Sequence, residues 1–513
     1  MNSLCKLAIN IAARNRRRLL RQVVSKQQSR WTSTIENPPG MKPAPQFSIP
    51  HGIFGQATCH THPHLIQPGH LTCGISQMEF RERRETLVNK LAAEFENMHK
   101  SHIIVIPAAR KQYMSDKIPY VFRQNSDFFY LTGCLEPSAI LVMVKPAQTD
   151  SFKSVLFVHE KDAHAELWEG PRTGSSAAAG LFAVDEARPV ENFAGFISKI
   201  TASSKPAVVW YHGDSPANPD IHSTIQSAAK AAQATVADPQ RALHFMRVHK
   251  SPAEIELMKE TCYIGAHAMN MAMATTKPGV TEHQVNAVLD YSCRQSGAEH
   301  LAFPPVVAGG ARATHIHYVA NNQVLNDGDM LLVDSGSQRW LYNSDISRTW
   351  PVSGQFSKYH RILYELVLTV QLRLIEILGE HRPALDQLFD SMCRLLGAQL
   401  QQEGVLPRHI DGSELIGKAY RLCPHHVSHY LGLDVHDAPL VRRNVPVAPG
   451  MVVTVEPGIY IRPDDTSVPP EFRGVGIRIE DDVLVTEGTP LVLTDAAVKE
   501  VRDVEAIVGK HAH

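Results

Sequence analysis

Four acidic residues and one histidine in the second half of the chain stand in apolar surroundings, where burying a charge costs most. Asp334 ends the run Met-Leu-Leu-Val-Asp, and Asp345 follows eleven residues later. Glu456 ends Met-Val-Val-Thr-Val-Glu, and Glu480 lies within Ile-Arg-Ile-Glu-Asp-Asp-Val-Leu-Val. His429 falls in His-Val-Ser-His-Tyr-Leu-Gly. We expect all five at strand positions, so any fold of this chain must place these groups where a partner offsets their burial.

Two divalent cations are the simplest such partner. Four converging carboxylates repel one another by several kcal/mol at an effective dielectric constant of about 20, and a total charge of +4 cancels that repulsion. If the chain turns between Gly336 and Leu341, the flanking strands pair, and Asp334 and Asp345 face one cleft. The alternative is that each acid is a separate surface or salt-bridged residue. The complete set favours one shared dinuclear metal site.

The first half of the chain has the pattern of an α/β domain. Apolar residues recur among charged ones near Met78–Glu96, which predicts a helix. Short apolar runs then predict buried strands, and helical and strand segments alternate up to about Arg247. The predicted strands are His102–Pro107, Phe128–Thr132, Ala139–Val144 and Val155–Val158.

A second, α+β domain begins with a helix-start signal. In Ser251-Pro-Ala-Glu254, serine can cap free N–H groups, proline suits the first turn, and glutamate reaches back. Thr281–Gln284 repeats this signal before a helix that ends near Gly297. Further predicted helices are Tyr359–Leu378 and Leu385–Gln402, and predicted strands are Met330–Val333, Asp345–Trp350, Met451–Val455 and Gly476–Val485.

The chain begins with a basic segment. Residues 1–35 contain eight Lys and Arg and no acidic residue, which is typical of a mitochondrial targeting peptide; a basic arm that touches RNA or lipid is the alternative. Because the 513-residue chain has a formal net charge of −1, the remainder carries −9, which argues against a nucleic-acid-binding protein. Five prolines in Asn37–Pro50 predict a linker. The predicted boundaries are 1–35 targeting peptide, 36–65 Pro-rich linker, 66–247 N-terminal domain and 248–513 catalytic domain.

Several motifs carry a resemblance to a known family. The order and spacing of motifs from about Ser251 to Glu480 resemble the pita-bread metallopeptidases, which include methionine aminopeptidase, prolidase and aminopeptidase P. The first domain is similar to the creatinase-type N-terminal domain. The mitochondrial aminopeptidase P type is the most similar, through Ala165-Glu-Leu-Trp-Glu-Gly-Pro-Arg172, Pro304-Pro-Val-Val-Ala-Gly-Gly310 and Cys423-Pro-His-His-Val-Ser-His429.

The resemblance implies a role for each site residue. Asp334 would chelate one metal, Asp345 and Glu480 would bridge the pair, and His429 and Glu456 would complete the coordination of the second ion. A metal-bridging hydroxide would attack the scissile carbonyl, with Glu456 as general base and proton carrier. His317 and His436 would bind substrate and stabilise the oxyanion, and Arg478 would orient a ligand carboxylate. Phe303 stands where relatives often carry tyrosine, so it keeps an aromatic wall without the hydroxyl. The implied substrate-binding set is Phe303, His317, Asp334, His436 and Arg478.

The implied activity is release of the first residue from peptides and proteins whose second residue is proline, with trimming of imported mitochondrial proteins as a broader variant. One nitrogen among carboxylate oxygens suits Mn²⁺, although Co²⁺ and Zn²⁺ also bind such shells. We expect a mitochondrial homodimer with no nucleic-acid or membrane partner; a form without the leader would be cytoplasmic. Two other functions stay open: an Xaa-Pro dipeptidase (prolidase), and a non-catalytic pita-bread interaction protein.

Other segments imitate functional sites. Cys59–Cys73 holds two Cys and four His, but its spacing matches no common zinc motif, so a loop is expected. His425 and His426 are expected to stay away from the metals, because only His429 need face them. Trp168 lines the cleft or packs in the first domain. Gly309-Gly310 predicts a bend rather than a phosphate loop, because no helix with Lys-Ser/Thr follows. The eight cysteines contain no CxxC pair, which indicates free thiols.

Overall fold

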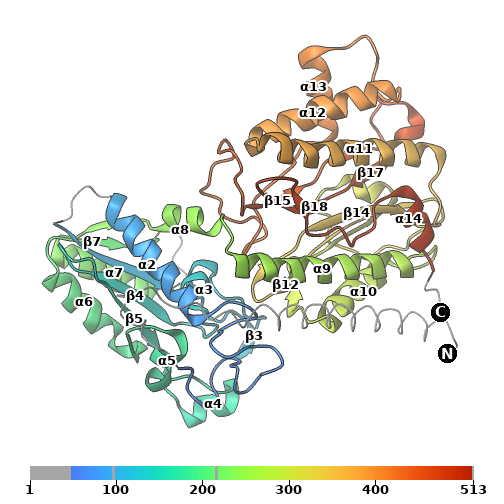
Figure 1. Ribbon diagram of the computed structural model, residues 1–513. Helices are drawn as coiled ribbons and strands as arrows, with labels where there is room; N and C mark the ends of the chain where they lie inside the picture. Colours follow the sequence, from blue (N-terminus) through green and yellow to red (C-terminus); the bar gives the residue numbers. More distant parts are fainter. Residues whose placement is uncertain (1–47, 95–98, 214–217, 511–513) are drawn as a thin grey trace, which may run out of the picture. The chain divides into compact units, whose positions relative to one another are not determined.

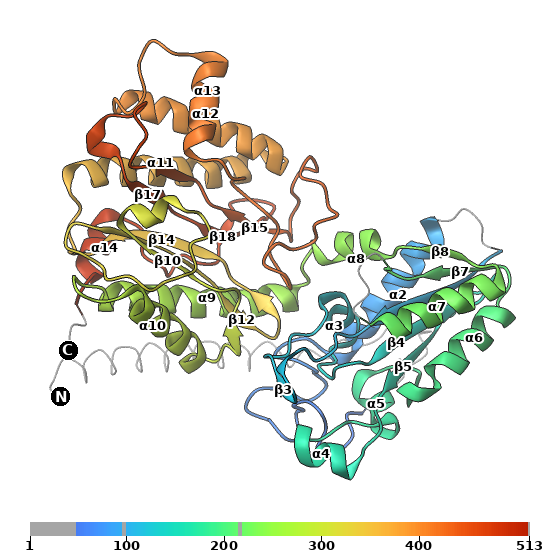
Figure 2. The same ribbon diagram turned by 180° about the vertical axis from the view of Figure 1, so that it is seen from behind.

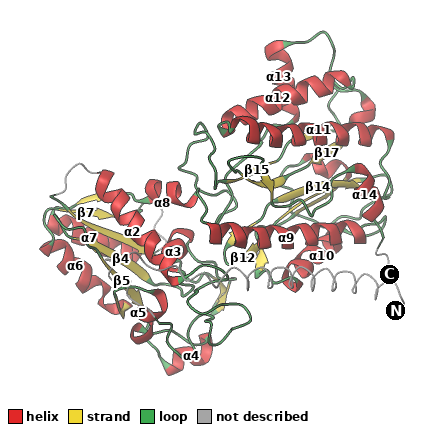
Figure 3. Cartoon of the chain, in the orientation of Figure 1, coloured by secondary structure: helices red, strands yellow, loops and turns green. Residues whose placement is uncertain are grey.

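The computed structural model describes residues 48–94, 99–213 and 218–510. The predicted targeting peptide 1–35 lies outside these residues, as does the part of the predicted linker before Ser48. The described chain contains a first α/β part followed by a larger part in which helices surround several small sheets; Figure 3 distinguishes the helices from the strands.

The first part is built on one mixed sheet with strand order β6-β5-β4-β1-β7-β8. Its strands are β1 (Ser101–Pro107), β4 (Ile140–Lys145), β5 (Lys153–Val158), β6 (Glu186–Pro189), β7 (Ala207–Trp210) and β8 (Thr235–Ala237), with a separate hairpin of β2 (Tyr113–Ser115) and β3 (Ile118–Pro119). Its helices are α2 (Gln77–Glu94), α3 (Ser126–Thr132), α4 (Ala163–Glu169), α5 (Ser175–Phe182), α6 (Phe193–Ser203), α7 (Pro219–Ala232) and α8 (Gln240–Arg247).

Both faces of this sheet are buried, which explains why its strands read as continuous apolar runs. In β1, Ile103 and Val105 point into a cluster with residues of α6 and α7. Ile104 and Ile106 point into the opposite cluster, which includes residues of α2, α3 and α5. The alternation follows from the two-residue period of a strand. The predicted strands at β1, β4 and β5 are therefore confirmed.

The prediction of a strand at Phe128–Thr132 is wrong, because these residues form α3. The Asn125 side chain accepts a hydrogen bond from the Phe128 N–H, and Gly133 ends the helix with φ of 65°. Every residue of α3 is buried, so its apolar run carries no helical period that distinguishes it from a buried strand.

The predicted linker 36–65 is also wrong where the structure describes it. Ile49, Phe54 and Cys59 are buried and belong to the cluster under α2. Residues 48–65 are therefore folded against the first part, although they contain no regular element. Their few apolar residues are spaced irregularly, and for that reason the sequence gives no sign that they are buried.

The second part contains short sheets flanked by long helices. The helices are α9 (Pro252–Thr275), α10 (Glu282–Gln295), α11 (Lys358–His381), α12 (Leu385–Gln402), α13 (Gly412–Leu422) and α14 (Val501–Ile507). The strands are β9 (His300–Leu301), β10 (Val306–Gly309), β11 (Met330–Ser335), β12 (Ser337–Arg339), β13 (Tyr342–Asn343), β14 (Ile346–Pro351), β15 (Val452–Val455), β16 (Gly458–Ile461), β17 (Val475–Arg478), β18 (Asp481–Leu484) and β19 (Leu491–Val492). They form the sheets β10-β11-β14, β13-β12-β9, β15-β18-β19 and β16-β17.

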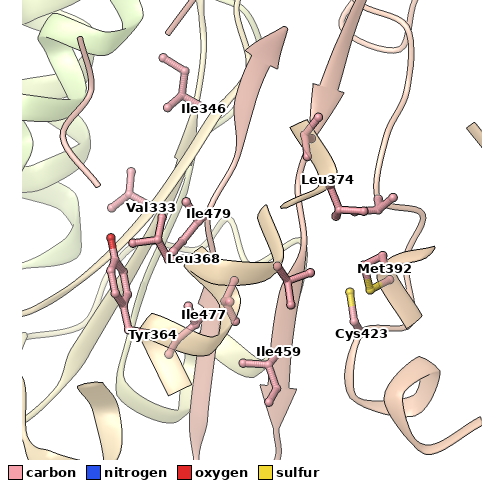
Figure 4. Packing of buried hydrophobic residues seen from close by; sticks show 14 of the residues in the cluster. Val333, Ile346, Tyr364, Leu368, Leu374, Met392, Cys423, Ile459, Ile477 and Ile479 are labelled. Atoms are coloured by element: carbon pink, nitrogen blue, oxygen red, sulfur yellow. The ribbon is translucent and has the colours of Figure 1, made fainter. Parts of the chain in front are cut away.

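In this part the strands lie between helices. Figures 1 and 2 show β14, β15, β17 and β18 with α9 on one side and α11 on the other. Figure 4 shows Val333 of β11 and Ile477 of β17 in one cluster with Tyr364 and Leu368 of α11. All four side chains are buried, so the sheets that carry the acidic residues have a rigid apolar backing on the α11 side.

The two helix-start signals are confirmed. Ser251 caps α9 and Glu254 closes a capping box, with proline in the first turn. Thr281 and Gln284 form the same arrangement at the start of α10.

The predicted turn between Asp334 and Asp345 is present. Strands β11 and β14 pair antiparallel with Asp334 opposite Ser347, and β12 and β13 form a hairpin between them. The two residues of its loop, Trp340 and Leu341, have φ of 50° and 65°, the turn geometry that matches strand twist. Both side chains are buried, which offsets the strain of positive φ in bulky residues.

One cationic side chain joins the two parts of the described chain. Arg247, at the end of α8, donates to Asp127 of α3 at 2.7 Å and to Asp434 at 2.6 Å. It also contacts Asp437, which pairs with the buried Lys250 at 3.3 Å. The loop that follows His429 is therefore tied to both α3 and α8.

Candidate metal centre

Strand ends bring the predicted ligands together. Asp334 lies inside β11, whereas Asp345 directly precedes β14, Glu456 directly follows β15 and Glu480 directly precedes β18. The prediction that all five stand at strand positions is therefore wrong in detail, and the predicted strand Gly476–Val485 is divided in two. The break at Glu480 lets its N–H donate to the Ser347 carbonyl at 3.0 Å, which links β14 to the β15-β18 sheet.

His429 belongs to an extended segment beside β15. Its N–H donates to Thr454 Oγ1 at 3.1 Å, and its carbonyl accepts from the Thr454 N–H at 3.0 Å. Two residues earlier, the Val427 carbonyl accepts from the Glu456 N–H at 3.0 Å. These bonds hold the imidazole beside the end of β15, where Glu456 emerges.

Three side chains form a compact ligand group. The candidate ligand atoms of Asp345, His429 and Glu480 all lie within 4.8 Å of one another, and the three side chains are buried. His429 Nε2 lies 3.4 Å from Asp345 Oδ2 and 3.7 Å from Glu456 Oε1. Within the described residues this is the one group of three or more His, Cys, Asp or Glu side chains close enough to hold an ion.

Asp334 is joined to this ligand group through Arg478. Its Oδ2 accepts a hydrogen bond of 2.7 Å from Arg478 Nη2, while its buried Oδ1 has no hydrogen-bond partner among the described residues. Arg478 also donates to Ser347 Oγ at 2.7 Å, and Ser347 Oγ donates to Glu480 Oε2 at 2.7 Å. Arg478 thus connects Asp334 to Glu480 through one hydroxyl.

The carboxylates resist ionisation without cations. Burial, and then the charges of neighbouring carboxylates including Asp334, raise the pKa values of Asp345 and Glu480 well above their usual range. Burial also raises the pKa of Glu456, against opposing effects of His429 and Arg478. An unpaired buried oxygen on Asp334 and three such carboxyls are what a divalent cation would satisfy, so these residues fit a metal site.

Asp482, a carboxylate outside the predicted ligand set, supports the candidate centre through hydrogen bonds. Asp482 Oδ2 accepts from the Asp345 N–H at 3.0 Å and from the Cys262 thiol at 3.3 Å. Burial raises the pKa of Asp482 to about 7. Its contact with the Asp345 backbone fixes the peptide that carries a predicted bridging ligand.

Comparison with known proteins identifies the family. The family model described as metallopeptidase family M24 matches residues 256–487, and the model described as aminopeptidase P, N-terminal domain, matches residues 80–210. Xaa-Pro aminopeptidase 3 of Rattus norvegicus is 40% identical over 485 residues, which cover 93% of this chain and 95% of that relative. The chain belongs to metallopeptidase family M24.

Two further relatives support this M24 assignment. Intermediate cleaving peptidase 55, mitochondrial, of Arabidopsis thaliana is 34% identical over 462 residues, covering 90% of this chain and 88% of that relative. The structure of zinc-substituted Escherichia coli aminopeptidase P in complex with product is 33% identical with a TM-score of 0.77, covering 84% of this chain and 98% of that one. The predicted fold, an α/β N-terminal domain followed by a pita-bread catalytic domain, is confirmed, and M24 membership implies divalent metal ions.

Histidines line the rest of the M24 site. The His436 ring lies 4.5 Å from the His429 ring, centroid to centroid. Burial, followed by the charges of His429, Arg443 and His317, lowers the pKa of His436 to about 4, so it is neutral at physiological pH. His317 is exposed on the segment after β10, within electrostatic range of both His436 and His425.

His425 lies closer to the predicted ligands than the sequence indicated. Its Nε2 lies 2.8 Å from the Tyr460 hydroxyl, and its Nδ1 lies 3.6 Å from Glu456 Oε2. Burial, and then Arg478, lower its pKa to about 4. His426 instead stacks on Phe389 at 4.8 Å. The even spacing between His425 and His429 was the available signal, because alternate residues of an extended segment share a side.

Phe303 lines a cavity of about 810 Å³ together with Leu301, Pro304 and Val121. It precedes β10, whose Val306 pairs with Asp334 of β11, so the residues after the cavity wall run beside the strand that carries a predicted ligand. Its predicted position near the substrate path is compatible with this placement.

The structure also bears on the Cys59–Cys73 segment, the cysteines and Trp168. Within 48–94, 99–213 and 218–510, the Cys59–Cys73 segment gathers no three-ligand metal group, and its His60 ring stacks on His51 at 3.8 Å. The described cysteines are free thiols. Trp168 is 75% exposed, so the packing alternative is wrong. No helix in these ranges has the length and apolar character to cross a membrane.

Proposed function

We propose that this chain is a metal-dependent aminopeptidase that releases the first residue of peptides and proteins whose second residue is proline. We also propose that it trims single residues from the new N-termini of imported mitochondrial proteins. The convergence of Asp345, His429 and Glu480 within 4.8 Å carries the enzymatic part. The names of the rat and Arabidopsis relatives support the substrate class and the compartment.

The metals would be held by the predicted ligands. Asp334, Asp345, His429, Glu456 and Glu480 offer carboxylate oxygens and one imidazole nitrogen, and this donor set favours Mn²⁺, with Co²⁺ and Zn²⁺ as competitors. When bound, two such cations would neutralise the carboxylates, acidify water and polarise a carbonyl group.

The chain's own side chains would handle the proton. Glu456 is partly buried beside His429 and His425, and its raised pKa suits a group that takes a proton from the attacking water and returns it to the leaving amine. Arg478 would hold Asp334 in the correct orientation through their 2.7 Å contact.

Substrate contacts would come from the histidines. His436 is neutral at physiological pH and can donate one hydrogen bond to the developing oxyanion. His317 would bind the peptide from the opposite segment, and Phe303 would provide an apolar wall without a hydroxyl.

The remaining parts of the proposal follow the sequence. Residues 1–35 would direct the chain to mitochondria, 66–247 would form the N-terminal domain and 248–513 the catalytic domain. The active form would be a homodimer that acts on peptide N-termini and not on nucleic acid.

Purified, manganese-loaded protein tests the activity. An Xaa-Pro-Yaa tripeptide should be cleaved with a kcat/KM at least about 10-fold above that of the Xaa-Ala-Yaa control, which corresponds to about 1.4 kcal/mol of discrimination. Cleavage of Xaa-Pro dipeptides alone would indicate a prolidase instead.

Mass spectrometry of mitochondrial N-termini tests the processing role. Loss of the protein should leave one-residue extensions on imported proteins. Unchanged N-termini would reject this part of the proposal while leaving the peptidase activity intact.

A further inference from the structure

A buried carboxylate outside the metal centre organises the segment that carries His317. Glu282 is the first residue of α10, and its side chain is fully buried. Its Oε1 accepts from Gly309 N at 3.0 Å and from Arg312 Nε at 2.7 Å. Its Oε2 accepts from the Tyr318 hydroxyl at 2.8 Å and from Gln323 N at 3.0 Å.

All four donors belong to residues 309–323, and His317 lies in the middle of this segment. The Glu282 N–H also donates to the Gln323 carbonyl at 2.9 Å, so the start of α10 contacts both ends of the segment. A buried carboxyl group with four donors, one of them a guanidinium group, makes strong, directional bonds. The carboxylate therefore closes residues 309–323 into a loop.

This loop has little regular structure of its own. Strand β10 ends at Gly309, one short helical turn covers Gly310–Thr314, and the next strand begins at Met330. Ile316 and Tyr318 pack against the small cluster that contains Tyr460, while His317 between them is exposed. The orientation of His317 thus depends on the two residues that flank it.

The loop is also seated against the strand that leads to Arg478. A Cβ atom at Gly476 in β17 would lie 2.1 Å from the Ala313 carbonyl oxygen, so the close approach requires glycine there. Tyr460, in the cluster under the loop, contacts both His425 and Arg478. The position of the loop is therefore fixed relative to the candidate metal centre through β17 and Tyr460.

We propose that Glu282 is a positioning residue that fixes His317 against the metal centre. Its side-chain hydrogen bonds go to Gly309, Arg312, Tyr318 and Gln323 and to none of the predicted ligands, so it acts through Tyr318 and the loop ends. This inference rests on the proposed function, because it assumes that His317 binds substrate.

A double-mutant cycle tests the proposal. Glu282→Gln keeps the shape of the side chain but turns an N–H₂ group toward donors, so the loop loses at least one acceptor. We expect Glu282→Gln to lower kcat/KM on an Xaa-Pro tripeptide at least 10-fold. His317→Ala should lower the same kcat/KM by a similar factor. If Glu282 acts through His317, adding Glu282→Gln to His317→Ala changes kcat/KM less than twofold.

Glu254→Gln is the matched control. Glu254 is another buried carboxylate in the first turn of a helix, and it accepts from the Tyr342 hydroxyl at 2.6 Å and from Ser251 N at 2.9 Å. Its donors lie outside residues 309–323, so its effect should multiply with that of His317→Ala. The proposal would be overturned if the losses of kcat/KM caused by Glu282→Gln and His317→Ala also multiplied in the double variant. A His317→Ala variant with normal activity would overturn it as well. An inactive wild-type enzyme would instead reject the proposed function.

Hydrogen exchange of the metal-free protein gives a readout independent of activity. Glu282→Gln should increase exchange at Gly309 and Gln323, and Glu254→Gln should not. If Glu282→Gln fails to fold, Tyr318→Phe removes one donor and should show the same non-additivity with His317→Ala. Unchanged exchange across 309–323 in a folded Glu282→Gln variant would contradict the role of the carboxylate.

Discussion

Arg478 Nη2 donates a hydrogen bond of 2.7 Å to Asp334 Oδ2 and leaves the other oxygen of that carboxylate buried, with no hydrogen-bond partner in the described part of the chain. One oxygen of Asp334 is thus occupied by the protein, and the other is free for a cation. The same guanidinium contacts the Tyr460 hydroxyl at 2.6 Å and Ser347 Oγ at 2.7 Å. These three contacts require the planar fork of arginine.

Arg478→Lys should weaken metal binding and catalysis together. A single ammonium group cannot reach three acceptors in different directions, so we expect a loss of about 10–100-fold in metal affinity and in kcat/KM. Metal titration followed by calorimetry and steady-state kinetics measure the two effects. Arg462→Lys is the control, because Arg462 is exposed and pairs only with the nearby Asp464 among the described residues. Equal metal affinity in Arg478→Lys and the wild type would contradict this reading.

Asp345→Asn should have opposite effects on activity and on the stability of the metal-free protein. Removing a bridging charge is expected to lower kcat/KM by at least about 100-fold, the upper end of the losses seen for supporting partners. Without metal, the substitution removes a buried acid whose pKa is raised by burial and by neighbouring acids, so the melting temperature should rise. Metal analysis and calorimetry check both expectations. Full activity with unchanged metal content would refute the assignment.

Removal of the metal ions should make the stability of the protein depend on pH. Asp345 and Glu480 have raised pKa values in the folded protein, so each stabilises the fold only while protonated and destabilises it as pH rises through the folded pKa. The metal-free protein should therefore lose stability as the pH rises above the ordinary pKa range of Asp and Glu, by about 1.4 kcal/mol per pH unit for each proton bound preferentially by the folded state.

Bound cations should flatten that dependence, because they compete with protons for the same oxygens. Thermal denaturation with manganese and with chelator, at several pH values, measures the difference. Parallel pH profiles for the two forms would show that the acids and the metal are not linked.

His425→Ala should lower kcat by about 10–100-fold, which is typical for loss of a residue that supports a metal-ligating carboxylate such as Glu456. His425 lies between Tyr460 and Glu456, whereas its neighbour His426 stacks on Phe389. His426→Ala should therefore keep nearly full activity. Steady-state kinetics of the two variants, at matched metal occupancy, separate the roles, and equal losses would argue for a structural contribution only.

The chemistry of the site was more predictable than its geometry. A charged side chain at the end of an apolar run indicates a site, because burying an unpaired charge costs free energy. This holds for Asp334 and Glu456 regardless of the exact strand limits. The interruption between β17 and β18 at Glu480 depends on a backbone hydrogen bond to Ser347, which is 133 residues away in sequence. Pairings over such distances leave no local pattern.

The same limit explains two other differences. The strand predicted at Phe128–Thr132 is a helix because tertiary burial surrounds it on all sides and removes any period. His425 was set aside because proximity in sequence to His429 does not reveal which neighbour faces the metals. Glu282 gave no signal at all, since a glutamate at the start of a helix is ordinary and its donors follow 27 to 41 residues later.

The contacts of Arg247 bear on how this protein could be divided. His436 lies between Asp434 and Asp437, and both of these acids are bound by Arg247, which belongs to the predicted N-terminal domain. A chain cut at residue 248 would retain every predicted metal ligand and yet leave Asp437 with Lys250 as its remaining described cationic contact. The smallest unit able to hold His436 in place is therefore larger than the segment that contains the predicted metal ligands.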